Sequence, residues 1–422
     1  MKRNKSDMHD HLVRTIRRKQ RPFFSAVGVC FLCFGSMLVF GETAATNAPV
    51  ADRRDELIRE LLQRVDSLET EVKTLKSGAA PNAVPLETPA SGEDTGRRQR
   101  FPDLKFHGFG DVQYHYSDVP GDNNSFALGT LDLFVTSRLA DRVNVLSETV
   151  IRAGSNNRFA ISIERLVLGY SANDYFNVDI GRGHTAIGYW NAAYHHGSWF
   201  QTSVNRPFIF AFNGILPIHN IGISANGLIP SGSLGLRYLI EVGNGRHYGP
   251  SADEPNQNVT DDNDFKAVNV ALIARPDWAP GLQMGISAYH DTLTPAGIPR
   301  TDQLILAAHV VYRTSRLEWL NEFVLLRHRS NGGEAHHTPA VYTQIAPRFG
   351  QFQPYVRYEY QNAPAGDPIF SSFGVVGVRH GPSVGVRYDF TDFAAFKIQY
   401  DHVRQENQSS ANEITGQVGF TF

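Results

Sequence analysis

The most informative pattern is a two-residue alternation in residues 412–422. Ile414 and Val418 fall on one side of an extended chain, whereas Thr415 and Gln417 fall on the other. Because successive side chains of a strand point to opposite faces, the alternation predicts a β-strand with one apolar and one polar face. In a water-soluble sheet this strand would be an exposed apolar edge. The pattern therefore favours a closed barrel whose apolar face contacts lipid.

The same alternation recurs in short segments from residue 101 onward, with charged residues opposite the apolar face. Clear examples are 131–139, 234–242, 304–313, 317–325, 384–390 and 396–401. Helical crossovers are absent from the pattern, which argues against an α/β enzyme. We therefore expect an all-β fold, a transmembrane antiparallel β-barrel over residues 101–422. Around residues 160–170, Glu164 and Arg165 can both face inward only if the strand contains a bulge.

Short and long connections alternate between these segments. The short ones are 140–142, 171–174, 229–233, 276–281, 314–316, 348–351 and 391–392. The mostly longer ones are 118–125, 152–158, 183–217, 243–264, 292–300, 329–336, 361–381 and 405–411. Short periplasmic turns and longer outer loops are typical of transmembrane barrels, and the segmentation gives about sixteen strands. An even number places both ends of the barrel on the periplasmic side.

The composition agrees with a barrel and excludes other classes. The chain has 422 residues, of which 41% are hydrophobic, and its mean hydropathy is −0.28. It is too polar for a bundle of membrane helices, whereas alternating strands place half of their residues toward water. The net charge of −2 gives no indication of nucleic-acid binding.

Residues 1–45 are predicted to be a secretory signal peptide. A basic stretch precedes an apolar run at 23–41, and small residues follow it. The alternative is an uncleaved membrane anchor, because the run is near spanning length. Cys30 and Cys33 lie inside the run, so a processed chain would contain no thiol.

Residues 51–77 contain a heptad pattern that predicts a short α-helical coiled coil. Its a positions are Ile58, Val65 and Val72, and its d positions are Leu61, Leu68 and Leu75. The β-branched a positions favour two chains, whereas Leu57 and Leu62 widen the stripe and favour three. The alternative is a single amphipathic helix lying on its own domain. Residues 78–100, rich in Pro, Ala, Ser and Gly, read as a linker.

The connection at residues 183–217 is too long and too aromatic for a solvated loop. We expect it to fold back into the barrel lumen and narrow it, because its aromatic side chains need a dry environment. The alternative is that they cap the rim or contact a neighbouring subunit. The polar residues available to face the remaining gap are His184, Asn191, His195, His196, Gln201, Asn205 and Arg206.

In this architecture the chain resembles trimeric outer-membrane porins. The closest type is that grouped as phosphate-selective porins O and P, which includes dicarboxylate porins with an amino-terminal coiled coil. The resemblance covers most of the chain after the signal peptide and includes the phrase NVDIGRGHTAIGYWN at 177–191. It implies a bacterial outer-membrane homotrimer with its coiled coil in the periplasm, surrounded by lipid and lipopolysaccharide. The terminal Phe422 resembles the signal read by the barrel-assembly machinery.

Porins of this type carry small anions past arginines and lysines. Here the barrel region has only Lys105, Lys266 and Lys397, so a phosphate-type lysine cluster is absent. Arginine is common, and its fork binds carboxylates and phosphates alike. We therefore predict a passive porin for small hydrophilic, anionic solutes. The candidate constriction and lining residues are Arg138, Arg182, His184, His195, His196, Arg206, Arg237, Arg313, Arg357 and Arg387.

Three alternatives accompany this prediction. Acidic residues such as Asp132, Glu241 and Asp389 share the arginine face, so the arginines can instead be salt-bridged wall residues. The barrel can be a structural anchor, with the coiled coil as a periplasmic tether. An outer-membrane enzyme would need a site, but the pairs at 195–196 and 336–337 lack a third placed ligand. We therefore predict no catalytic residues, no metal and no cofactor.

Overall fold

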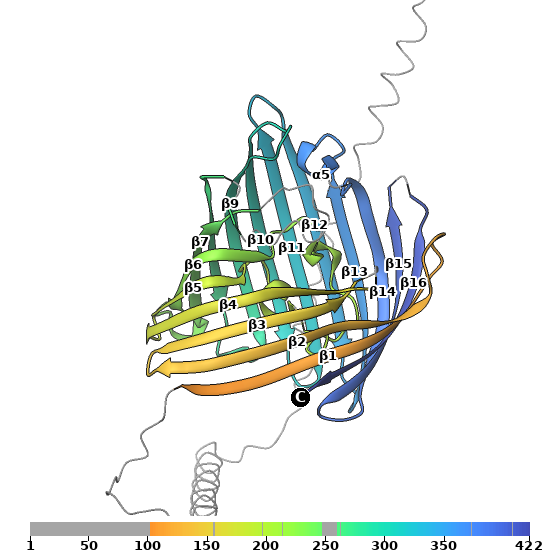
Figure 1. The fold of residues 1–422 in the computed structure, drawn as a ribbon, viewed down its shortest axis with the longest axis horizontal. Coiled ribbons are helices and arrows are strands. Elements are labelled where there is room, and N and C mark those ends of the chain that lie inside the picture. Colours follow the sequence, from red (N-terminus) through yellow and green to blue (C-terminus); the bar gives the residue numbers. More distant parts are fainter. Residues whose placement is uncertain are drawn as a thin grey trace, which may run out of the picture. The chain divides into compact units, whose positions relative to one another are not determined.

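The computed structural model describes residues 102–422 except 155–156, 196, 213, 247–259, 262, 373 and 407. The predictions for residues 1–45, 51–77 and 78–100 lie outside the described residues. Within the described part, sixteen strands form a closed antiparallel barrel in which each strand pairs with its neighbours in sequence (Figure 1). The predicted fold class and strand number are confirmed.

The first half of the barrel consists of β1 (Asp103–Ser117), β2 (Ser125–Ala140), β3 (Val143–Ala153), β4 (Phe159–Asn173), β5 (Phe176–His184), β6 (His219–Leu228), β7 (Leu236–Asn244) and β8 (Lys266–Ala274). The second half consists of β9 (Leu282–Leu293), β10 (Thr301–Arg313), β11 (Leu317–Ser330), β12 (Ala335–Pro347), β13 (Phe352–Ala363), β14 (Gly377–Asp389), β15 (Ala394–Gln405) and β16 (Ala411–Thr421). The helical elements of the described residues are α4 (Trp190–Tyr194), α5 (Pro368–Ser372), η1 (Phe208–Phe210) and η2 (Gly232–Leu234). No helix among the described residues is long and apolar enough to cross a membrane.

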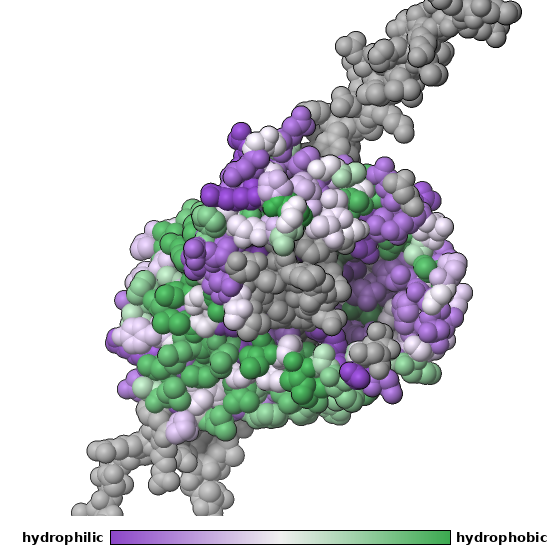
Figure 2. All heavy atoms as spheres, turned by 45° about the horizontal axis from the view of Figure 1, so that its top comes forward, coloured by the Kyte–Doolittle hydropathy of each residue, from purple (hydrophilic) through white to green (hydrophobic). Residues whose placement is uncertain are grey.

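The last strand closes the barrel and shows how its faces are arranged. β16 pairs with β1, and the register joins Ile414 to Tyr116. Ile414 and Val418 are each 40% exposed, whereas Thr415 and Gln417 are 2% and 1% exposed. This order of polarity is the reverse of that in a soluble protein. Figure 2 shows hydrophobic side chains over much of the outer face and hydrophilic side chains along the rim.

β4 contains the bulge that its sequence requires. In the pairing of β3 with β4, Glu148 is opposite Arg165, and the next residue of β3, Thr149, is opposite Ile163. Glu164 is therefore the extra residue of a β-bulge, and it is fully buried. Arg165 forms an ion pair with Glu148 of the neighbouring strand. The adjacent side chains of Glu164 and Arg165 therefore both point inward.

Gly181 in β5 occupies a backbone conformation that side-chain-bearing residues avoid. Its φ is +136°, and an added Cβ would collide with the carbonyl oxygen of Leu166. We expect Gly181→Ala to destabilise the barrel by about 2 kcal/mol, because strain of this kind costs 1–3 kcal/mol. Thermal unfolding, followed on gels as loss of the compact folded band, measures the effect. Gly416→Ala is the matched control, because nothing lies within 4 Å of its added Cβ. Equal melting temperatures for the two variants would contradict the expectation.

Strands β10 and β11 carry apolar residues on both faces, in addition to the charged residues of their inner face. Leu306 and Phe323 point outward and are 44% exposed, whereas Ile305, Leu320 and Val324 point inward and are fully buried. The sequence pattern identified the outward residues and the inward charges of these strands, but not this apolar inner wall. The inner apolar residues belong to a hydrophobic cluster inside the barrel.

Candidate functional site

The connection between β5 and β6, residues 185–218, lies inside the ring of strands (Figure 1). We call it the inward loop. Its apolar side chains pack with the inner faces of β10, β11 and β12 in one buried cluster. Trp190, Ile209, Phe210 and Ile215 of the loop are each at most 1% exposed. The loop is therefore held to one side of the barrel by a dry contact, as its aromatic composition requires.

Buried carboxylates of β11 fix the first part of the loop. Glu322 accepts hydrogen bonds from the backbone N–H groups of Tyr189 (2.5 Å) and Trp190 (2.8 Å) and from the Tyr342 hydroxyl (2.6 Å). Glu318 accepts a hydrogen bond from the Tyr194 hydroxyl at 2.7 Å. Burial, together with the nearby Glu318 charge, raises the pKa of Tyr194, so this hydroxyl remains a donor.

Three buried cations fix the middle of the loop through its carbonyl groups. Arg357 donates to the carbonyl oxygen of Asn205 at 2.8 Å. Arg387 donates to the carbonyl oxygens of residues 199 and 201 at 2.5 and 3.1 Å. Lys397 donates to those of residues 198 and 203. The exposed fractions of Arg357, Arg387 and Lys397 are 1%, 8% and 0%. These cations therefore lie between the wall and the loop backbone.

Four predicted site residues come together where the loop leaves β5 and returns to β6. Arg182 is buried and donates to the carbonyl oxygen of Glu164 at 3.1 Å. The rings of His184 and His195 are stacked, with centroids 3.7 Å apart. Arg206 donates to the carbonyl oxygens of His195 and of residue 210, the latter at 3.0 Å. His196 lies outside the described residues.

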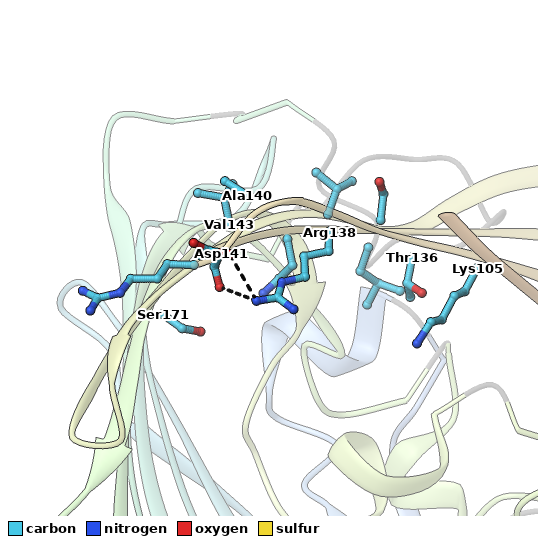
Figure 3. A pocket seen from close by; sticks show the side chains of 12 residues that line it. Lys105, Thr136, Arg138, Ala140, Asp141, Val143 and Ser171 are labelled. Carbon is cyan, nitrogen blue, oxygen red and sulfur yellow. Dashed lines mark hydrogen bonds and ion pairs between the residues drawn. The ribbon is translucent and has the colours of Figure 1, made fainter. Parts of the chain in front are cut away.

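The other predicted arginines lie at the barrel end with the short turns. Arg313 is 3.3 Å from Glu318 and donates to the Tyr189 hydroxyl at 2.9 Å. Arg237 lies at the start of β7 and is partly exposed. Arg138 pairs with the Asp141 carboxylate at 3.7 Å and donates to its carbonyl oxygen at 3.1 Å, in a hollow of about 420 Å³ (dashed lines in Figure 3). The predicted set therefore does not form one ring.

Two further arginines lie against aromatic residues of the loop. The Phe212 ring contacts the guanidinium groups of Arg206 and Arg152, whose carbons are 3.8 and 4.8 Å from its centroid. The guanidinium carbon of Arg379 lies 4.6 Å from the Phe208 ring centroid. All three arginines are partly exposed. The sequence interpretation placed residues 152 and 379 in connections, whereas the structure includes both in strands.

Carboxylates line the inner wall of four successive strands. They are Asp111 of β1, Asp132 of β2, Glu148 of β3 and Glu164 of β4, all buried. Glu148 pairs with Arg165, and Glu164 lies 3.8 Å from Arg182. The wall thus carries both signs of charge, and several of its arginines have acidic partners.

Comparison with known proteins supports the fold. The chain is similar to the anion-selective porin of Comamonas acidovorans, with 12% identity over 76% of this chain and 100% of that chain and a TM-score of 0.56. It is also similar to Salmonella typhi OmpF solved with daunomycin (10% identity, 76% and 97% covered, TM-score 0.54) and to the outer membrane channel DcaP of Acinetobacter baumannii (9% identity, 76% and 97% covered, TM-score 0.53). At these identities the likeness shows a shared porin-type barrel. No protein-family model matches the sequence, and no curated protein matches it.

Proposed function

We propose that this protein is an outer-membrane porin through which small hydrophilic solutes diffuse passively. The observation that carries the proposal is a closed barrel with an apolar outer face and a long loop fixed inside it. Sixteen strands enclose a lumen wide enough for water, and a loop attached to one wall narrows it. We assign the protein to the type of porin grouped as phosphate-selective porins O and P.

We propose further that the channel favours anions. Arg152 and Arg379 are partly exposed beside the loop, and contact with the rings of Phe212 and Phe208 holds their planar groups in place. A guanidinium held in this way presents N–H donors that match carboxylate and phosphate oxygens. The fixed positive charges lower the electrostatic barrier for an anion in the narrow passage. Arg182 and His184 of β5 belong to the barrel wall near this group, and His195 of the loop stacks on His184.

We propose that the barrel lies in the bacterial outer membrane as a homotrimer. The exposed apolar faces of the strands contact lipid, with lipopolysaccharide in the outer leaflet, and three copies associate. Residues 1–45 direct export, and residues 51–77 form a periplasmic coiled coil. Phe422 pairs with Gly108 through two backbone hydrogen bonds of 2.9 Å, and its side chain is 59% exposed. This exposed terminal aromatic is available to the barrel-assembly machinery.

Purified protein in a planar lipid bilayer tests the proposal directly. A trimeric porin gives conductance steps in groups of three, and a salt gradient across the bilayer gives a reversal potential of the sign expected for anions. Protein that is folded and inserted but does not conduct would remove the porin function. Conduction with cation preference would remove only the anion selectivity.

The Arg152→Glu variant tests the source of the selectivity. We expect the reversal potential to shift toward cations or change sign, because the substitution changes the wall charge by two units beside Phe212. Arg379→Glu should act in the same direction. Arg329→Glu is the matched control, because this arginine is exposed near the end of β11 and outside the group around Phe212 and Phe208. An equal reversal potential in all three variants would exclude Arg152 and Arg379 from the passage.

A further inference from the structure

Three histidines from separate parts of the chain meet where the inward loop joins the barrel. His184 ends β5, His195 follows α4, and His219 begins β6. One ring nitrogen from each lies within 4.8 Å of the others. The His195 ring also meets that of His219 edge to face, with centroids 4.6 Å apart. His219 is the third placed ligand that the sequence interpretation did not find, because it lies more than thirty positions after His184 in the chain.

The surrounding hydrogen bonds orient the His195 ring. The Asn191 side-chain amide N–H₂ donates to the carbonyl oxygens of Thr185 and Ile218, each at 2.9 Å. Its oxygen therefore accepts from His195 Nδ1, 2.7 Å away. A proton on Nδ1 leaves the lone pair on Nε2, and an outer hydrogen bond of this kind usually orients a metal-binding histidine.

Two carboxylates and two arginines surround the cluster. Glu164 Oε2 lies 2.8 Å from His219 Nε2, and Glu148 Oε2 lies 4.0 Å from His184 Nε2. Arg165 and Arg182 pair with these two carboxylates, which offsets the arginine charges. Arg206 directs its N–H groups at loop carbonyls. Both carboxylates are buried, and Glu164 is close enough to the cluster to offer a fourth ligand.

We propose that His184, His195 and His219 bind one divalent transition-metal ion of the Zn²⁺ or Cu²⁺ class. Imidazole nitrogens suit these ions, and three histidines with a fourth water or carboxylate ligand are a common zinc arrangement. Zn–N bonds of about 2.0–2.1 Å place tetrahedral ligands about 3.3 Å apart, so the nitrogens need to approach by about 1.5 Å at most. Side-chain rotations that fan the stacked His184 and His195 rings supply this movement.

The bound ion would join the middle of the inward loop to both of its ends. His184 and His219 lie on neighbouring strands, paired directly in the register of β5 and β6, and His195 lies on the loop. The bound ion would therefore fix the loop to β5 and β6 and would not act as a catalytic centre. The metal-site proposal does not depend on the proposed transport function, because Zn²⁺ binding is measured without any recording of conductance.

Calorimetric titration of ZnCl₂ into the exported, detergent-solubilised protein without a polyhistidine tag tests the proposal. After treatment with a chelator, we expect one saturable Zn²⁺ site per chain and no saturable binding of MgCl₂. His195→Ala and His219→Ala should each weaken Zn²⁺ binding at least tenfold. The double variant His336→Ala with His337→Ala is the control, since these adjacent histidines lie on β12, outside the cluster. Wild-type protein without a saturable site, or unchanged affinity in the first two variants, would overturn the proposal.

X-ray absorption of the zinc-loaded wild-type protein gives a test that needs no variant. We expect nitrogen ligands at about 2.0–2.1 Å, with the scattering pattern of imidazole rings. Zinc bound only through oxygen would overturn the assignment. This measurement also decides the case in which a histidine variant fails to fold.

Discussion

Glu322→Ala is expected to release the first part of the inward loop and to raise the single-channel conductance. The carboxylate is buried and accepts hydrogen bonds from the backbone of Tyr189 and Trp190 and from Tyr342. Alanine leaves these donors without an acceptor in a dry cluster, and each buried unsatisfied donor costs about 1–3 kcal/mol. We expect a loss of about 3 kcal/mol for the docked state of the loop, which shifts the loop toward undocked positions.

Thermal unfolding and bilayer recording together check this expectation. The folded band should be lost at a lower temperature, and the conductance steps should be larger and noisier than in the wild type. Glu322→Gln should have a smaller effect, because the amide oxygen still accepts hydrogen bonds. Some destabilisation should remain, because the amide N–H₂ group faces a donor. Glu334→Ala, an exposed position between β11 and β12, is the control. Wild-type stability and conductance in Glu322→Ala would show that the loop is held by its apolar contacts alone.

The second large effect is expected from the double variant Arg357→Met with Lys397→Met. The two cations donate to the carbonyl groups of residues 203 and 205, and Lys397 also reaches residue 198. Methionine fills similar space but donates nothing, so the middle of the loop loses two of its three cationic attachments and keeps that of Arg387. The barrel strands keep their pairing, and we expect the loop to loosen far more than the barrel.

Limited digestion with chymotrypsin measures this loosening. We expect cleavage after Trp199 or Phe200 at least tenfold faster than in the wild type, with the sixteen-strand barrel still folded on gels. Lys266→Met is the control, because Lys266 pairs with Asp261 outside the loop. If digestion of the double variant matches the wild type, these cations do not restrain the loop.

The barrel was predictable because its forces act on neighbouring residues. The alternation around Ile414 and Val418 identifies a strand and its two faces without further information. Adjacent Glu164 and Arg165 require a bulge for the same local reason, and the register contains it. Long and short connections then give the strand number, because antiparallel neighbours need only a turn.

The site was less predictable because it depends on which wall the loop contacts. The pattern placed Arg357 and Arg387 on an inner face, but it could not show that loop carbonyls cover them. Arg152 was read as a loop residue, although β3 extends past it. His219 carried no local sign of a role, since its partners come from β5 and from the loop. Contacts between residues far apart in sequence determine these features, and the two-residue alternation of the strands does not predict such contacts.

The attachment of the inward loop to β11–β15 has a consequence for the order of folding. Every strand on that wall follows the loop in the chain, and the hydrogen bonds of Tyr189 and Val204 span 133 and 195 residues. Contacts of such long sequence separation form slowly, because the intervening chain must first be ordered. The loop can therefore take its docked position only after the strands of this wall have joined it.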